Sequence, residues 1–121
     1  QEVGKPIKES TADKTLDFMK DTVEDPIYGT GYDTYGIDGV SVSAKTGTAQ
    51  IFENGQVLTG PNDYLYSVVQ IAPTENPEYI MYVTLRKPKI IGEQSAAELV
   101  AEVSNSMLKH AFKVDVSNSE D

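Results

Sequence analysis

The chain has 121 residues, of which 39% are hydrophobic and 24% charged, so its length and composition suit one small globular domain. Its 10 Lys and Arg against 19 Asp and Glu give a net charge of −9, which argues against binding to nucleic acid or to an anionic membrane surface. Cysteine is absent, and this excludes disulfides, thiolate metal sites and a cysteine nucleophile.

Two further features of the sequence concern membrane segments and the start of the chain. No apolar run approaches the roughly 20 residues that a membrane-spanning helix needs, and no signal-peptide pattern is present. Gln1 is not a translation start. We therefore expect the chain to be part of a longer or processed polypeptide.

The first predicted element is a helix that begins at Ser10 and stops at Asp25. Residues 1–9 are polar and broken by glycine and proline, which indicates a lead-in loop. Ser10 or Thr11 suits the N-cap position, and with Ser10 as the cap, Asp13 is the acidic residue three positions on. The residue before a proline is disfavoured in the α region, so Asp25, followed by Pro26, ends the helix. Apolar residues recur at helical spacing between these ends: Leu16, Met19 and Val23.

Residues 26–39 are rich in Gly, Tyr and Asp, and the pattern predicts a surface loop. A dinucleotide-binding fingerprint would need glycine at position 34, where Thr34 stands, and no strand precedes it. Asp33 and Asp38 do not have the spacing of a calcium-binding loop. The pattern on its own therefore assigns no ligand to this segment.

Three strands are predicted next, in an antiparallel arrangement. The first spans residues 40–52, and Asn54-Gly55 after it is a strong signal for a hairpin turn, with residues 56–59 running back. The second and third span residues 64–72 and 79–86. The third carries apolar residues on both faces, so we expect both faces to be covered, and two helices with three strands hardly provide that cover alone.

A second helix is predicted from Ser95, because Ser95 and Glu98 form a capping box before an apolar periodic run that ends at Phe112. Residues 113–121 are acidic and serine-rich, which predicts a disordered tail or linker. The order of elements indicates an α+β fold with helices packed against an antiparallel sheet.

The first strand contains an unusual combination of residues. Lys45 interrupts its apolar run, and Gly47 stands where a strand favours a side chain, which suggests close approach of a ligand or another backbone. Thr46 and Thr48 are two residues apart and project from one side of the strand, while Lys45 projects from the other. A cation, two hydroxyls and backbone groups without a side chain over them are together the kind of groups that bind a carboxylate and a polarised carbonyl.

This stretch, Lys45-Thr46-Gly47, resembles the third signature motif of the penicillin-recognising serine enzymes. Its surroundings also match in order: Asp25-Pro26-Ile27-Tyr28-Gly29-Thr30-Gly31 before it, then Ala49-Gln50-Ile51, Thr59-Gly60-Pro61-Asn62-Asp63-Tyr64 and Ala72-Pro73-Thr74-Glu75-Asn76-Pro77. Over residues 3–112 the succession is similar to the end of the transpeptidase domain of class B high-molecular-weight penicillin-binding proteins, and most similar to septal, 2x-type members.

The resemblance implies a fold and an activity. Residues 1–112 would be the C-terminal portion of a transpeptidase domain of the penicillin-binding/serine β-lactamase-like fold, with the last three of five strands. The family forms an acyl-serine intermediate from a D-alanyl-D-alanine peptide and passes the acyl group to an amine of a neighbouring peptidoglycan stem peptide. β-Lactams mimic that peptide and stop at the acyl-enzyme.

The resemblance also implies residue roles. Lys45 would keep the cleft positive and hydrogen-bond the serine of a Ser-x-Asn motif, which aids proton transfer. Thr46 and Thr48 would bind the substrate carboxylate, and Gly47 would keep the strand clear for the substrate. The Thr48 backbone N–H would be one donor of the oxyanion hole.

The nucleophile motif, Ser-x-x-Lys, and the Ser-x-Asn motif are expected in the preceding part of the same polypeptide. Ser106 and Lys109 have the letters of the nucleophile motif, but they follow Lys45 in the chain instead of preceding it. The other implied partners are peptidoglycan stem peptides and β-lactams, without nucleic acid, cofactor or metal. The parent protein would be anchored upstream and work on the outer face of the bacterial cytoplasmic membrane.

Two alternatives remain open from the sequence. One is a penicillin-binding sensor or regulatory domain, which keeps the fold but uses acylation as a signal. Transfer of the acyl group to an amine would separate it from a transpeptidase. The other is a non-enzymatic interaction module that uses the strand edge beside Lys45, for which no covalent labelling is expected.

Overall fold

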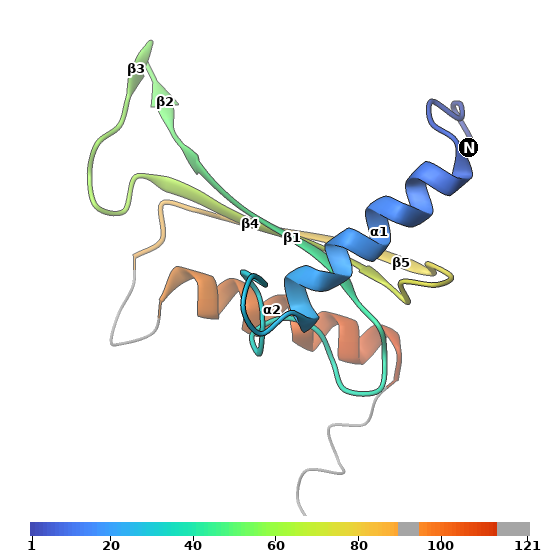
Figure 1. Ribbon diagram of the computed structural model, residues 1–121. Coiled ribbons are helices and arrows are strands. Elements are labelled where there is room, and N and C mark those ends of the chain that lie inside the picture. The colour runs from blue at the N-terminus through green and yellow to red at the C-terminus, as the bar shows by residue number, and fades with distance from the viewer. Residues whose placement is uncertain (90–94, 114–121) are drawn as a thin grey trace, which may run out of the picture.

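The computed structural model describes residues 1–89 and 95–113, and these form two helices, a three-stranded sheet and a short two-stranded ribbon (Figure 1). The elements follow the predicted order, which confirms the α+β class. Their bounds are α1 Glu9–Glu24, β1 Ser43–Gln50, β2 Phe52–Glu53, β3 Gln56–Val57, β4 Tyr64–Ala72, β5 Tyr79–Arg86 and α2 Ala96–Ala111.

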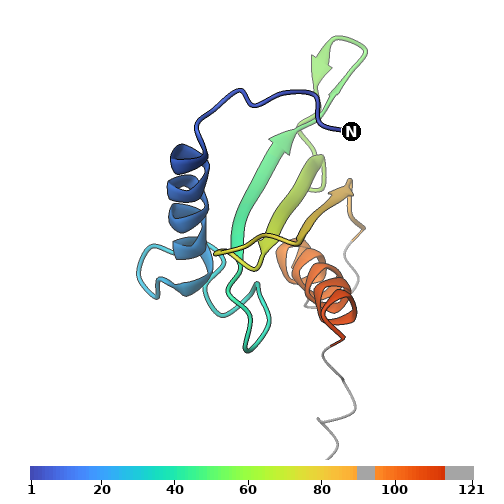
Figure 2. The same cartoon turned by 90° about the vertical axis from the view of Figure 1, so that its right-hand side faces the viewer.

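The sheet has the strand order β1-β4-β5, and both pairs are antiparallel. The helices lie on opposite sides of it: α1 packs against β1, and α2 packs against β4 and β5 (Figure 2). The β2–β3 hairpin continues beyond the end of β1, with the predicted turn at Asn54-Gly55, where both residues have positive φ. Residues 114–121, which include most of the predicted tail, lie outside the described part of the chain.

The start of α2 agrees with the sequence prediction, and the start of α1 does not. The Ser95–Glu98 capping box of α2 is confirmed, with both reciprocal hydrogen bonds present. The predicted N-cap of α1 at Ser10 or Thr11 is wrong, because the helix begins at Glu9 with Lys8 as its N-cap. The Lys8 carbonyl accepts from the N–H groups of Thr11 and Ala12, so Ser10 already lies within the first turn.

The hydrophobic core lies between the sheet and α2. Val68 in the central strand is fully buried and packs with Val100 and Ala101 of α2, and Leu108 of α2 packs against Ala72 at the end of β4. Burying a side chain of this size stabilises the fold by roughly 1.5–3 kcal/mol. This helix therefore fixes the sheet, and with it the position of β1.

The loop of residues 26–39 contributes to this core, which corrects the prediction of a simple surface loop. Tyr35 and Ile37 are only 8% and 9% exposed, and Tyr35 packs in the same cluster as Val68. Composition alone does not reveal that two large side chains of a glycine-rich loop are buried. The loop is therefore part of the framework on which the site is built.

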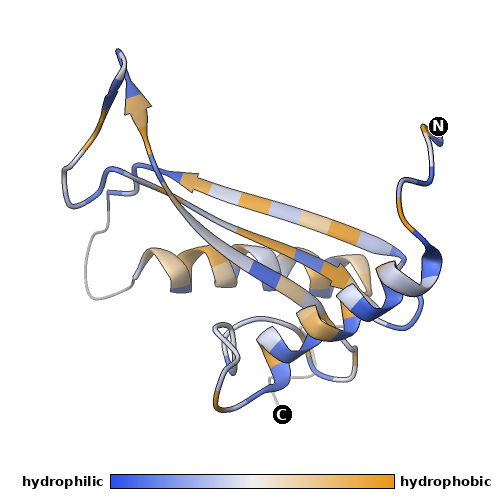
Figure 3. Ribbon diagram, turned by 45° about the horizontal axis from the view of Figure 1, so that its top comes forward, coloured by the Kyte–Doolittle hydropathy of each residue, from blue (hydrophilic) through white to orange (hydrophobic). Residues whose placement is uncertain are grey.

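The other face of the sheet carries apolar side chains without cover in the described residues. Figure 3 shows hydrophobic residues alternating with more polar ones along the sheet. Ile80 and Tyr82 of β5 are 74% and 66% exposed, whereas Met81, Val83 and Leu85 are partly buried and pack with residues of α2. Among the described residues α1 packs mainly on β1, so this face of β5 stays open, as expected of cover that two helices and three strands hardly provide alone.

Candidate active site

The outer edge of β1 presents backbone groups of Thr46 and Thr48 that lie outside the β1–β4 ladder. In β4, the central strand, the Tyr64 carbonyl accepts from the Lys87 N–H at 3.0 Å. The backbone N–H and C=O groups of Tyr64 and of every second residue after it are therefore directed to β5. The backbone groups of the residues between them are directed to β1, where they pair with Lys45, Gly47 and Ala49. Thr46 and Thr48 therefore direct their N–H and C=O groups away from the sheet.

Lys45 reaches this same edge. Its Nζ donates to the Thr46 carbonyl at 2.6 Å, which independently places that carbonyl outside the β1–β4 ladder. The Lys45 side chain is exposed and projects from the face opposite to Thr46 and Thr48 before it turns back to the edge. The arrangement brings a positive charge beside open backbone donors and acceptors.

A cavity of about 340 Å³ lies beside the two threonines. Its walls come from β1, from the neighbouring part of β4, from the loop at residues 30–35 and from the first turn of α2. The residues that line it are Thr30, Thr34, Tyr35, Thr46, Gly47, Thr48, Tyr66, Ser67, Ser95, Ala97, Glu98 and Val100. The hydroxyls of Thr46 and Thr48 thus border a space large enough to take a small anionic group.

Close packing requires glycine at position 47, in addition to the role that the resemblance implies for Gly47. It faces Ser67 across the β1–β4 pair, and a Cβ at Gly47 would lie 2.7 Å from Ser67 Oγ. A side chain there would displace the serine hydroxyl and fill part of the open strand surface. The absence of a side chain at Gly47 therefore keeps β1 and β4 in close contact.

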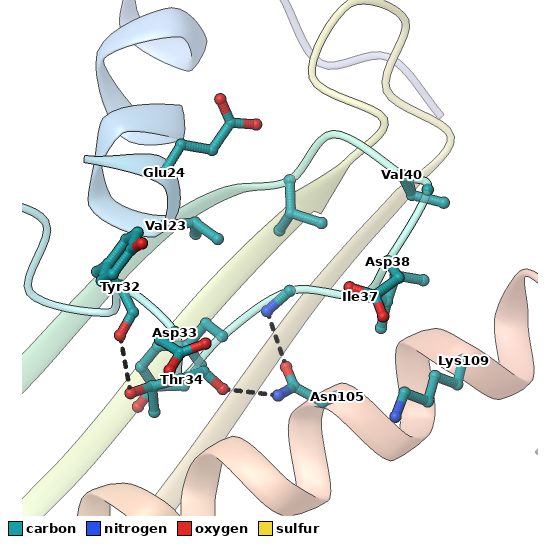
Figure 4. A pocket seen from close by; sticks show the side chains of 14 residues that line it. Val23, Glu24, Tyr32, Asp33, Thr34, Ile37, Asp38, Val40, Asn105 and Lys109 are labelled. Atoms are coloured by element: carbon teal, nitrogen blue, oxygen red, sulfur yellow. Dashed lines mark hydrogen bonds between the residues drawn. The ribbon is translucent and has the colours of Figure 1, made fainter. Parts of the chain in front are cut away.

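A buried polar network joins the loop to the sheet and to α2, and sequence reasoning missed it. The Gly36 N–H donates to Gln70 Oε1 at 3.1 Å. The same N–H donates to Asn105 Oδ1 at 3.0 Å, and Asn105 Nδ2 donates to the Thr34 carbonyl at 2.8 Å (Figure 4). Gln70 Nε2 donates to Ser104 Oγ and to Asn105 Oδ1. A glutamine in the middle of a β-branched strand was the signal that could have revealed it.

The larger cavity, of about 590 Å³, lies on the other side of this network from the motif strand. Figure 4 shows Asn105 and Lys109 of α2 facing the loop residues Ile37 and Asp38 across it. Thr34 and Tyr35 line both cavities, so this part of the loop is the wall between them. None of the predicted site residues borders this larger space.

The hairpin that continues the motif strand is fixed by ion pairs. Glu53 Oε1 accepts from Lys87 Nζ at 2.7 Å and from Arg86 Nη2 at 2.9 Å. Hydrogen bonds from Lys87 and then Arg86 hold the pKa of the Glu53 carboxyl below its usual value. These contacts tie the hairpin to the end of β5 and so limit its movement relative to β1.

The described residues do not assemble a complete serine site. Of the two serines lining the smaller cavity, Ser95 accepts from the Glu98 N–H as the cap of α2, and Ser67 has Gln70 instead of a lysine three residues on. Ser106 is exposed on α2 and borders neither cavity. Within the described ranges no cluster of His, Cys, Asp or Glu suits a metal ion, and neither helix is long and apolar enough to cross a membrane.

Three comparisons with known proteins agree with this geometry. Residues 1–109 match the family described as the penicillin binding protein transpeptidase domain. Over 91 residues, 74% of this chain, the sequence is 41% identical to the probable peptidoglycan D,D-transpeptidase PenA of Neisseria meningitidis. The chain spans only 15% of that relative's length.

Solved structures show the same likeness in three dimensions. The crystal structure of penicillin binding protein 2X from Streptococcus thermophilus superposes with a TM-score of 0.81 at 35% identity, over 91% of this chain and 17% of that one. Penicillin binding protein 3 from Mycobacterium tuberculosis, in its ampicillin complex, gives a TM-score of 0.63 at 27% identity, over 87% of this chain and 25% of that one. The chain therefore belongs to the penicillin-binding protein transpeptidase domain family.

Proposed function

We propose that this chain supplies the substrate-binding strand of a peptidoglycan D,D-transpeptidase that cross-links stem peptides and is acylated by β-lactams. The observation that carries the proposal is the open edge of β1, where Lys45 Nζ reaches the Thr46 carbonyl and two threonine hydroxyls border a cavity beside an outward backbone N–H. Family membership and the named activity of the PenA relative support it.

The chemistry at this edge is acyl transfer. An extended peptide adds to an open strand through main-chain hydrogen bonds, which would align a D-alanyl-D-alanine end with Thr46–Thr48. The hydroxyls of Thr46 and Thr48 bind its terminal carboxylate, and the Thr48 N–H donates to the oxyanion that develops on the attacked carbonyl. Lys45 adds a positive charge that favours both the carboxylate and the developing anion.

The same contacts explain reaction with β-lactams. A penicillin has a carboxylate and a strained amide carbonyl in place of the peptide's carboxylate and scissile carbonyl, so it meets the same hydroxyls and the same N–H. The ampicillin complex of the Mycobacterium tuberculosis relative supports this ligand class. The nucleophile, in a Ser-x-x-Lys motif, and a Ser-x-Asn motif lie in the preceding part of the polypeptide in this proposal.

The proposal extends to the class and location of the parent protein. Likeness to penicillin binding protein 2X favours a septal class B enzyme. Such an enzyme works on the outer face of the cytoplasmic membrane, anchored by a segment upstream. Fractionation of the producing cells, followed by detection of the complete protein, tests the location.

Transfer to an amine tests the activity. The complete protein is incubated with an acyl-donor thioester and a D-amino acid acceptor, and we expect the aminolysis product to accumulate with turnover. A penicillin-binding sensor would form the acyl-enzyme but would not pass the acyl group to the amine. An interaction module would form no acyl-enzyme, so either result would contradict the proposal.

A further inference from the structure

Thr30 lies at the junction of the two spaces that border the motif. It lines the 340 Å³ cavity together with Thr46 and Thr48, and a second cavity of about 240 Å³ together with Lys45. Its Oγ1 is 3.3 Å from Thr46 Oγ1, although the two residues are 16 positions apart in the chain. The loop thus brings a third hydroxyl to the carboxylate-binding edge.

The backbone around Thr30 is held by close packing. The Gly29 N–H donates to the Asp25 carbonyl at 3.0 Å, and the Gly31 N–H donates to the Thr22 carbonyl at 2.9 Å. A Cβ would lie 2.5 Å from the Asp25 carbonyl oxygen at Gly29 and 2.5 Å from the Tyr35 ring at Gly31. Only glycine fits at both positions, so Thr30 is fixed against the end of α1.

The end of α1 is itself anchored. The Asp25 carboxylate accepts from the N–H groups of Ile27 at 2.8 Å and Tyr28 at 2.9 Å. These backbone hydrogen bonds, with that of Tyr28 the stronger influence, lower the pKa of Asp25. Two hydrogen bonds from its own backbone thus hold the turn after α1, which places Thr30 beside Thr46.

The number of hydrogen bonds that a hydroxyl can donate and accept determines which of the two threonines donates to the other. Each threonine has one O–H to donate and can accept from others. When Thr46 donates its O–H to a substrate carboxylate, its oxygen is left to accept from Thr30. Such a chain strengthens the outer donor, because each hydrogen bond polarises the next. The 3.3 Å separation is longer than an ordinary O–H···O bond, and we expect it to shorten when substrate binds, as hydrogen bonds of unliganded sites often do.

We propose that Thr30 is a positioning residue, which turns the Thr46 hydroxyl towards the carboxylate of the bound peptide or β-lactam. The proposal rests on the transpeptidase function given above. The Gly29-Thr30-Gly31 turn therefore contributes to binding indirectly: Thr30 contacts Thr46, and Thr46 contacts the ligand.

The test uses the complete enzyme and measures the second-order rate of acylation by benzylpenicillin and by its methyl ester, which lacks the charged carboxylate. Thr30→Val keeps the shape of the side chain but removes the hydroxyl. We expect it to slow acylation by benzylpenicillin about fivefold, the usual effect of one hydrogen bond, and to leave the ester within twofold. Thr30→Ser keeps the hydroxyl and is expected to restore most of the rate.

A double-mutant cycle separates positioning from general structure. In a Thr46→Val background, Thr30→Val should have no further effect, because there is no hydroxyl left to orient. Thr15→Val, which removes a hydroxyl that bonds only within α1 to the Thr11 carbonyl, is the matched control and should change nothing. Equal slowing of penicillin and ester, an undiminished effect in the Thr46→Val background, or no effect of Thr30→Val would overturn the proposal. Absence of acylation in the wild-type enzyme would instead refute the proposed function.

Discussion

Replacing Lys45 with alanine in the complete enzyme is expected to slow acylation by penicillin about 100-fold or more while the protein stays folded. A preorganised donor or charge beside a developing oxyanion contributes on this scale. Lys45 is exposed, and its hydrogen bond to the Thr46 carbonyl joins neighbouring residues, so its removal leaves the core unchanged. Stopped-flow or gel-based acylation with fluorescent penicillin measures the rate.

Two matched variants make this result specific. Lys14→Ala removes another exposed lysine, on α1, and should leave acylation unchanged. Lys45→Arg keeps the charge but not the compact ammonium group, so it should recover only part of the rate. Acylation at the wild-type rate in folded Lys45→Ala protein would remove this residue from the site.

Gln70→Met is expected to lower the free energy of unfolding by about 2 kcal/mol, because it deletes hydrogen bonds to groups that stay buried. Gln70 is fully buried, and methionine has nearly its volume, so packing is kept while three polar contacts are lost. Ser104 Oγ then loses a buried partner, and the Gly36 N–H keeps only Asn105. Urea unfolding of the complete transpeptidase domain measures the change.

The same substitution has a local readout and a control. The Gly36 amide should exchange its hydrogen faster in Gln70→Met protein, because the loop loses one of its two anchors on that N–H. Gln56→Met, at an exposed position of β3, should change neither the stability nor the exchange. A change in unfolding free energy below about 0.5 kcal/mol, the size of an ordinary surface effect, would show that the network contributes little.

The strands of this fold were predictable because their signals are local. β4 and β5 begin and end where the sequence predicts, since β-branched and aromatic residues are bounded by turns rich in Pro, Asn and Asp. The Asn54-Gly55 turn and the Ser95 cap follow for the same reason. The side-chain alternation at Lys45, Thr46 and Thr48 also follows from the strand period alone.

The parts that were missed depend on contacts between distant segments. The pairing of Thr30 with Thr46 and the anchoring of Gly36 by Gln70 and Asn105 join residues that no local pattern relates. The exposure of Ile80 has a different cause. Its apolar character predicts cover, but α2 packs on the opposite face, and on this face α1 packs over β1 and leaves Ile80 74% exposed.

The most direct test of the central claim is to locate the penicillin adduct. The complete protein, with a protease site introduced before Gln1, is labelled with fluorescent penicillin, cleaved, and its two parts are separated and analysed by mass spectrometry. We expect the label on a serine of the preceding part and none on residues 1–121, although Lys45→Ala within those residues abolishes most of it. An adduct on this chain, at Ser106 or elsewhere, or no label on the complete protein, would contradict the account.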